Sequence, residues 1–271
     1  MINGTGLADF RRLISYSVLQ ISSVRLREIY SAVYETQLAI KTMEMAQSTL
    51  TRSMEKIYTV DQRCKFIAGW RAIHGTSPFV SALIIRVLRL GNGQTGRSLS
   101  QIHHIAWLLG EIIAEDVGID GERHSKLFSD FGKAYCGTDY WSLDQYRQVA
   151  CDNFRDYNEA SRVDRPVEQS LLALIASESW NSAEFNLFLS IFPTHSADER
   201  QLVRGGRELQ YLEAHADEAE NRHMKYAAEA FEIYCNDRGL MLSDSQIESS
   251  LLEYLENIGF AYAELRGIFE R

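Results

Sequence analysis

Residues 211–226 read YLEAHADEAENRHMKY, a run without glycine or proline that predicts a helix. The run holds two histidines and four carboxylates. On an α-helix, at about 100° per residue, Glu220 and His223 (i, i+3) share one face. Helical bundles use this Glu-x-x-His spacing to offer an oxygen and an imidazole to one metal ion. The alternative is a solvated acidic helix face.

Helical patterning extends from this run over the whole chain. Only three prolines occur in 271 residues, and long segments follow the 3.6-residue period. Serine and threonine stand at expected N-caps, such as Thr59, Ser182 and Ser243. No stretch alternates as a sheet requires, so the predicted class is all-α. The predicted helices cover residues 7–20, 23–56, 59–74, 77–90, 98–116, 122–135, 142–158, 165–179, 182–192, 197–234 and 243–269.

The breaks between these helices are too short and too apolar for an interdomain linker. We therefore predict a single domain over residues 1–271. Residues 1–55 could form an added helical pair at its N-terminal end.

Composition narrows the class of protein. A net charge of -9 argues against nucleic acid or an anionic membrane as the main partner, because phosphate binding needs a basic surface. The four cysteines are far apart and form no C-x-x-C pair, which indicates buried thiols in a reducing compartment. No signal-peptide pattern and no apolar run of membrane-spanning length is present. We expect a cytoplasmic protein whose partner is a small molecule.

Two further segments carry carboxylates in unusual places. Glu115 and Asp116 end a predicted helix, where the helix dipole disfavours negative charge by about 0.3–1 kcal/mol each. A cation between them and His124 would compensate; simple solvation in the following loop is the alternative. Glu178 ends the apolar run SLLALIASESW at 170–180. It is costly there unless paired, protonated or coordinated, or unless it lies at an exposed helix end.

The order of these pieces resembles the heme-oxygenase-like di-iron oxidase family, which shares the helical fold of heme oxygenase, TenA and PqqC. The resemblance covers roughly residues 57–235. The matching segments are AEDVGIDGERHSKLF, LLALIASES, YLEAHADEAENRH and WRAIHGTSPFVSAL.

That resemblance implies a heme-oxygenase-like multi-helix bundle with two irons per chain, cycling between Fe(II) and Fe(III), and O2 as co-substrate. It further implies oxidation of a small amine, amino acid or fatty-acid-like substrate, and a homodimer. Oxygen and imidazole donors suit iron or manganese. No catalytic residue is implied apart from the metal ligands. The implied ligands are Glu115 or Asp116, His124, Glu178, His215, Glu220 and His223.

The chain departs from the family pattern twice. His215 to His223 is one residue too long for the family's last motif, so a straight helix would turn His215 about 80° away. A π-bulge would restore the register; without it, His215 is a supporting or surface histidine. The family's early-helix glutamate is also missing. Either His74 replaces it, or one iron site is incomplete, or Glu35 or Glu44 supplies the carboxylate.

Two other functions remain open. Relatives with this bundle also carry out cofactor-free oxidation or hydrolysis in a closed cavity of His, Arg and Tyr side chains. Here Trp70, Arg71 and Trp107 are the candidates for the substrate pocket. Its candidate polar groups are His74, His124, His223 and Tyr226. The second possibility is a non-catalytic helical scaffold, for which Glu178 and His223 would be exposed.

Overall fold

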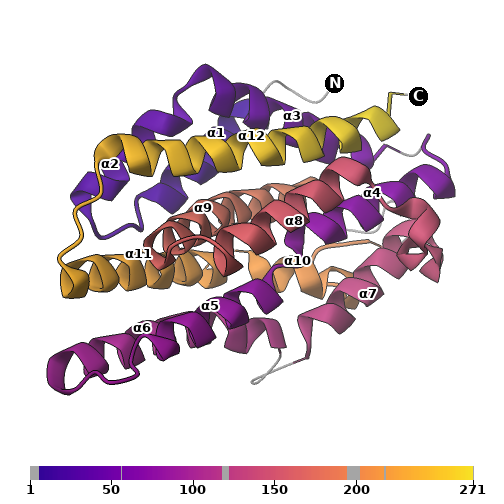
Figure 1. Ribbon diagram of the computed structural model, residues 1–271. Helices are drawn as coiled ribbons and strands as arrows, with labels where there is room; N and C mark the ends of the chain where they lie inside the picture. The colour runs from indigo at the N-terminus through magenta and orange to yellow at the C-terminus, as the bar shows by residue number, and fades with distance from the viewer. Residues whose placement is uncertain (1–5, 56, 118–121, 194–201, 217, 271) are drawn as a thin grey trace.

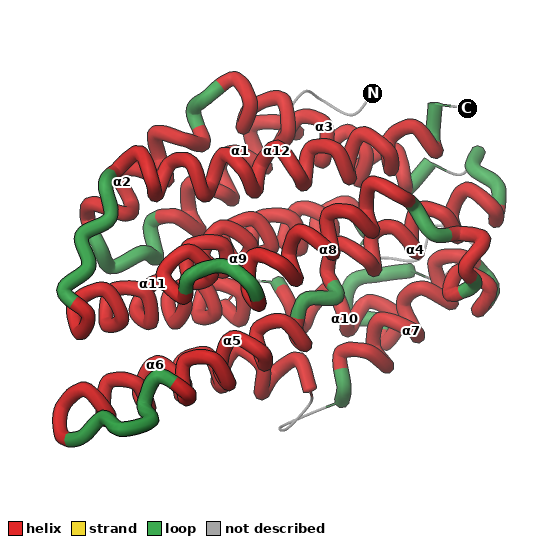
Figure 2. Tube along the Cα trace, viewed as in Figure 1, coloured by secondary structure: helices red, strands yellow, loops and turns green. Residues whose placement is uncertain are grey.

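The computed structural model describes residues 6–55, 57–117, 122–193, 202–216 and 218–270, and the side chains of residues 6–9, 115–116 and 218–221 also lie outside the description. Its described residues contain α-helices and no strand (Figure 2), which confirms the all-α prediction. Three short 3-10 turns lie at Asp139–Ser142, Asp144–Tyr146 and Arg207–Leu209. The α-helices are α1 (Gly6–Val18), α2 (Val24–Tyr34), α3 (Gln37–Ser53), α4 (Val60–His74), α5 (Ser77–Arg89), α6 (Gly96–Val117), α7 (His124–Cys136), α8 (Val149–Val163), α9 (Val167–Ile191), α10 (Gln210–His215), α11 (Glu218–Arg238) and α12 (Asp244–Ile268).

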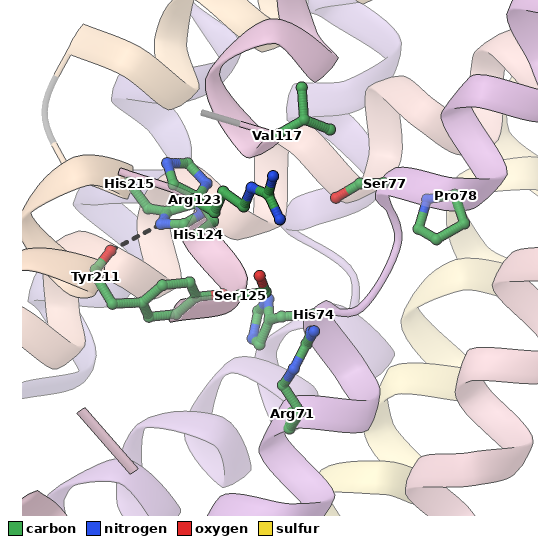
Figure 3. Close-up of a pocket in the computed structure, with 10 residues that line it drawn as sticks. All are labelled: Arg71, His74, Ser77, Pro78, Val117, Arg123, His124, Ser125, Tyr211 and His215. Carbon is green, nitrogen blue, oxygen red and sulfur yellow. Dashed lines mark hydrogen bonds between the residues drawn. The ribbon is translucent and has the colours of Figure 1, made fainter. Parts of the chain in front are cut away.

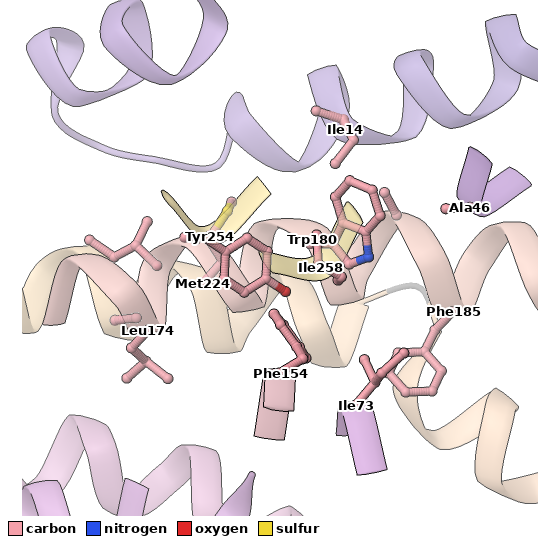
Figure 4. Packing of buried hydrophobic residues seen from close by; sticks show 14 of the residues in the cluster. Ile14, Ala46, Ile73, Phe154, Leu174, Trp180, Phe185, Met224, Tyr254 and Ile258 are labelled. Atoms are coloured by element: carbon pink, nitrogen blue, oxygen red, sulfur yellow. The ribbon is translucent and has the colours of Figure 1, made fainter. Parts of the chain in front are cut away.

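Helix α9 is the centre of the bundle. Its residues are buried on all sides, and α1, α8, α10, α11 and α12 all pack against it (Figure 1). Figure 4 shows Leu174, Trp180 and Phe185 of this helix interleaved with side chains from its neighbours. A polar side chain on α9 is therefore held inside the protein unless it lies near an end.

Several predicted helix boundaries differ from the structure. The helix predicted over 142–158 begins only at Val149, after two 3-10 turns. The segment predicted as one helix over 23–56 is α2 and α3, because Thr36 caps a new helix and accepts a hydrogen bond from the Ala39 N–H. The break predicted before Ser182 does not occur. Ser182 lies buried within α9, where the surrounding core leaves no water to satisfy a broken backbone and so favours a continuous helix. The caps predicted at Thr59 and Ser243 are confirmed, each as a capping box.

Close packing fixes the position of α4. A Cβ atom at Gly69 would lie 2.7 Å from Leu265 Cδ2 and 2.9 Å from Gln148 Cγ, so only glycine allows α4 to come this close to its neighbours. The last turn of α4, which carries Arg71 and His74, is held in place by this contact. Within the described residues, no helix combines the length and apolar character that crossing a membrane would require.

Candidate functional site

A cavity of about 440 Å³ lies where the ends of several helices meet. The last turn of α4, the first turns of α5 and α7, the end of α6 and the short helix α10 all contribute to it (Figure 3). Its described lining consists of Arg71, His74, Ser77, Pro78, Val117, Arg123, His124, Ser125, Tyr211 and His215.

Two histidines face each other in this cavity. The ring centres of His124 and His215 are 4.4 Å apart. His215 stacks on Phe185 of α9, with ring centres 4.4 Å apart and planes 19° from parallel. Its Nδ1 lies 2.8 Å from the carbonyl oxygen of Tyr211, which can only accept a hydrogen bond, so Nδ1 carries a proton. In the neutral ring, Nε2 of His215 therefore holds the lone pair and can accept a proton or bind a metal.

The described lining is basic, although the chain as a whole is acidic. Arg71 and Arg123 contribute guanidinium groups, and none of the described lining residues is a carboxylate. The Arg71 guanidinium lies 5.1 Å above the centre of the Phe128 ring, a cation–π contact that holds it in place. Helices α5 and α7 also begin at this cavity without a side-chain N-cap. The positive ends of these two helix dipoles add to the basic character.

His74 is anchored from behind by Glu184 of α9. Its Nε2 lies 2.8 Å from Glu184 Oε1, and the two side chains are 2% and 0% exposed. The same carboxylate accepts hydrogen bonds from two indole N–H groups, at 2.6 Å from Trp70 and 2.5 Å from Trp180. A buried carboxylate is costly unless such donors satisfy it, and here three N–H groups do so.

Burial alone would raise the pKa of Glu184. The pKa is instead lowered, because the positive charge of His74 in its protonated form and its hydrogen bond, together with hydrogen bonding from Trp70, outweigh desolvation. Glu184 is thus ionised at neutral pH. The Tyr262 hydroxyl faces this carboxylate outside normal hydrogen-bond geometry, and burial beside Glu184 raises the pKa of Tyr262.

A second buried pair lies on α9 and α11. His223 Nδ1 is 3.7 Å from Glu178 Oε2, and the two side chains are 4% and 6% exposed. Arg162, fully buried on α8, donates to the hydroxyl of Ser177 at 2.6 Å and to Asn158 Oδ1 at 2.8 Å. Burial lowers the pKa of Arg162, and the nearby negative charge of Glu178 opposes this effect. Glu178 and His223 are therefore not the exposed residues that a non-catalytic scaffold predicts.

The structure divides the predicted site residues into groups. Arg71, His74, His124 and His215 line the cavity, whereas Glu178 and His223 form their own pair outside its described lining. Trp70 lies fully buried beneath the cavity, in ring contact with His74 and Tyr211.

Four other predicted residues are not placed at the cavity. Trp107 is 53% exposed beside His104 and is absent from the described lining. The side chains of Glu115, Asp116 and Glu220 lie outside the described residues, although their backbones belong to α6 and α11.

The register of the 211–226 run is interrupted by a helix break. Helix α10 ends at His215, Ala216 is extended (φ −84°, ψ 167°), and α11 begins at Glu218. The predicted continuous helix over 197–234 is therefore wrong: the helix breaks after His215, which neither a straight helix nor a π-bulge described. The break places His215 and His223 on separate helices, so that each meets different partners.

Sequence reasoning missed Glu184, Tyr211 and Arg123. The signal for Glu184 was two i, i+4 pairs, Trp70 with His74 on α4 and Trp180 with Glu184 on α9. The helix break that we predicted between residues 179 and 182 separated Trp180 from Glu184 and concealed the second pair.

Comparison with solved structures identifies the fold. The chain is similar to the crystal structure of a TenA homolog from Pseudomonas syringae pv. tomato, with a TM-score of 0.57 and 12% sequence identity. The match covers 85% of this chain and 93% of that one. The protein therefore has a TenA-like helical fold, as the resemblance to the heme oxygenase, TenA and PqqC group implied. No protein-family model and no curated protein sequence matches the chain.

The described donors partly fit the two irons that the di-iron resemblance implies. His124 with His215 and Glu178 with His223 are two pairs of nitrogen and oxygen donors of the kind that iron accepts. In the part of the chain that the structure describes, no group of three or more His, Cys, Asp or Glu side chains is arranged to hold a metal. Each pair would need a further ligand from Glu115, Asp116 or Glu220.

Proposed function

We propose that this protein is an enzyme that transforms a small anionic molecule in the basic cavity by proton transfer, without a cofactor. The observation that carries this proposal is the lining itself: guanidinium groups, imidazoles and hydroxyls face one 440 Å³ space, and no carboxylate occurs among its described residues. The TenA-like fold supports a helical enzyme of this kind through the fold alone. Cavities of about this size enclose small molecules.

Each group in the lining has a defined task in this proposal. Arg71 and Arg123 bind the carboxylate or phosphate of the substrate, because guanidinium pairs with planar anions through two hydrogen bonds. His215 accepts a proton at Nε2, since its Nδ1–H is engaged by the Tyr211 carbonyl. His124, against which His215 packs, takes part in the same transfer. The Phe185 ring shields the His215 face from water.

Anion binding can be measured before the substrate is known. Inorganic phosphate is titrated into the protein while its thermal midpoint is recorded. We expect phosphate to raise the midpoint of the wild type, and Arg71→Gln and Arg123→Gln each to reduce that rise. Arg89→Gln, which alters an exposed arginine on α5, is the matched control. Equal phosphate effects in all four proteins would contradict anion binding in this cavity.

Turnover then tests the chemistry. Chelator-treated protein is incubated with a library of small carboxylates and phosphates, and products are sought by mass spectrometry. We expect turnover in the metal-free protein and its loss in His215→Ala. Turnover that requires added iron would reject the cofactor-free mechanism.

We also propose, as a second candidate, an iron-dependent oxidase that uses O2. Two pairs of donor side chains favour it: His124 with His215, and Glu178 with His223. Glu115, Asp116 and Glu220 would complete the ligand set, and bound iron would supply oxygen activation. His74 could join only through Nδ1, because Glu184 occupies its Nε2. Arg162 beside Glu178 would then help to balance the charge of that carboxylate.

Metal content separates the two candidates. The protein is expressed with iron and also reconstituted without oxygen, and iron per chain is counted. The oxidase predicts about two irons in the wild type and a loss in His223→Ala and His124→Ala, with folding preserved. His104→Ala, at a half-exposed side chain on α6, is the control. Unchanged iron content in both ligand variants would reject this candidate.

A further inference from the structure

The contact between His74 and Glu184 has no role in the proton-transfer mechanism above, although both side chains are buried and closely paired. The carboxylate is 0% exposed on the central helix and receives three N–H groups from two helices. His74 itself lines the cavity, as Figure 3 shows. Because a fully buried charge is costly to the fold, its contact with a cavity residue points to a task in the cavity.

The hydrogen bond fixes the chemical state of the imidazole. Both oxygens of Glu184 accept hydrogen bonds from indole N–H groups, Oε1 from Trp70 and Oε2 from Trp180, so the carboxylate is an acceptor here and Nε2 of His74 donates to it. In the neutral ring, the lone pair therefore lies on Nδ1. The ring cannot easily turn, since it packs between Trp70 at 4.6 Å and Phe185 at 4.8 Å, measured between ring centres.

We propose that Glu184 is a positioning residue that holds His74 as a second proton acceptor of the cavity, with Nδ1 as the reacting atom. This inference rests on the proposed function of the cavity. His74 comes from α4, whereas His124 and His215 come from α7 and α10, so proton-transfer groups enter from two walls. Arg71 lies one turn before His74 on α4 and lines the same cavity, where it binds the anionic end of the substrate.

The proton balance of this step is simple. A substrate bond to hydrogen breaks, and its proton moves to Nδ1 of His74. The bonding electrons stay on the substrate, whose negative charge is stabilised by Arg71. His74 becomes an imidazolium that is paired with ionised Glu184. His74 can return this proton at a second position of the substrate, which regenerates the neutral ring, so the substrates that fit are small anions that isomerise by proton transfer.

Nuclear magnetic resonance of the histidine rings tests the positioning role without a substrate. The protein is labelled with 15N in histidine, and the His74 signals are assigned with His74→Asn. We expect neutral His74 in the wild type to carry its proton on Nε2 alone, and Glu184→Gln to lose this single tautomer. Glu159→Gln, at an exposed position of α8, should leave the pattern unchanged. A proton on Nδ1 in neutral wild-type His74, or a persistent imidazolium at neutral pH, overturns the inference even if Glu184→Gln does not fold.

Adding inorganic phosphate to the same sample separates this inference from the proposed function. A shift of the His74 Nδ1 resonance together with those of His124 and His215 supports both. A response from His124 and His215 without one from His74 overturns the inference and leaves the proposed function standing. If no histidine responds, anion binding in the cavity is wrong, and the tautomer still decides the positioning role of Glu184.

Discussion

Replacing Glu184 with glutamine removes one buried charge while keeping the shape of the side chain. The carboxylate accepts from Trp70 and His74 on Oε1 and from Trp180 on Oε2. A glutamine oxygen facing α4 keeps two of these bonds, each weaker by about 1 kcal/mol without the charge. Its amide group then opposes the Trp180 N–H, which costs about 1–3 kcal/mol. Burying a neutral amide costs less than burying a charge, which offsets part of this loss. We therefore expect Glu184→Gln to lower the free energy of unfolding by about 2–4 kcal/mol at neutral pH.

The pH dependence of this stability difference shows whether the charge of Glu184 causes it. Because the pKa of Glu184 is lower in the folded protein than its ordinary 4.5, its ionisation stabilises the fold above that value. The contribution disappears as the pH falls through the lowered pKa. Urea unfolding of wild type and variant should therefore show a gap that is full at neutral pH and shrinks below 4.5, with equal m-values. A gap that stays constant with pH, or is below about 1 kcal/mol throughout, would refute the reasoning.

Three further outcomes follow from packing. Gly69→Ala should lose about 1–3 kcal/mol in urea unfolding because its Cβ would meet Leu265, whereas Gly110→Ala in α6, where the new Cβ meets nothing within 4 Å, should gain up to about 1 kcal/mol. Arg162→Ala should cost about 3–5 kcal/mol of unfolding free energy. Arg162→Met should stay folded and cooperative, with a smaller change in either direction, and denaturant titration measures both. Trp107→Phe should remove most of the acrylamide-quenchable tryptophan emission and leave stability nearly unchanged, since this ring is 53% exposed.

Helix positions were predictable from the sequence because they depend on local signals. Thr59 and Ser243 begin their helices with capping boxes that the sequence displays directly. The wrong boundaries arose where tertiary packing decided the outcome. Ser182 resembles an N-cap locally, but in the middle of α9 it is surrounded by core, and continuing the helix satisfies the backbone more fully than a break.

The candidate site was predicted only in part, because local signals do not show how helices pack together. Periodicity places a residue on a helix face, and buried Glu178 and His223 indeed meet across α9 and α11. It does not show which helix ends converge, so Arg123 and Tyr211 could not be assigned to the cavity from spacing. Nor does periodicity show how far a helix face is buried: Trp107 was predicted to line the pocket, but it lies on the surface.

The helix break after His215 is the feature on which both candidate functions depend. On one straight helix, the side chains of His215 and His223 would lie about 80° apart around the helix axis. Ending α10 at His215 frees this ring to stack on Phe185 and face His124, while α11 starts anew and directs His223 to Glu178. A proton-transfer cavity needs only the first arrangement, whereas an iron pair needs both. Variants of His215 should therefore disable either enzyme, and variants of His223 should disable only the oxidase.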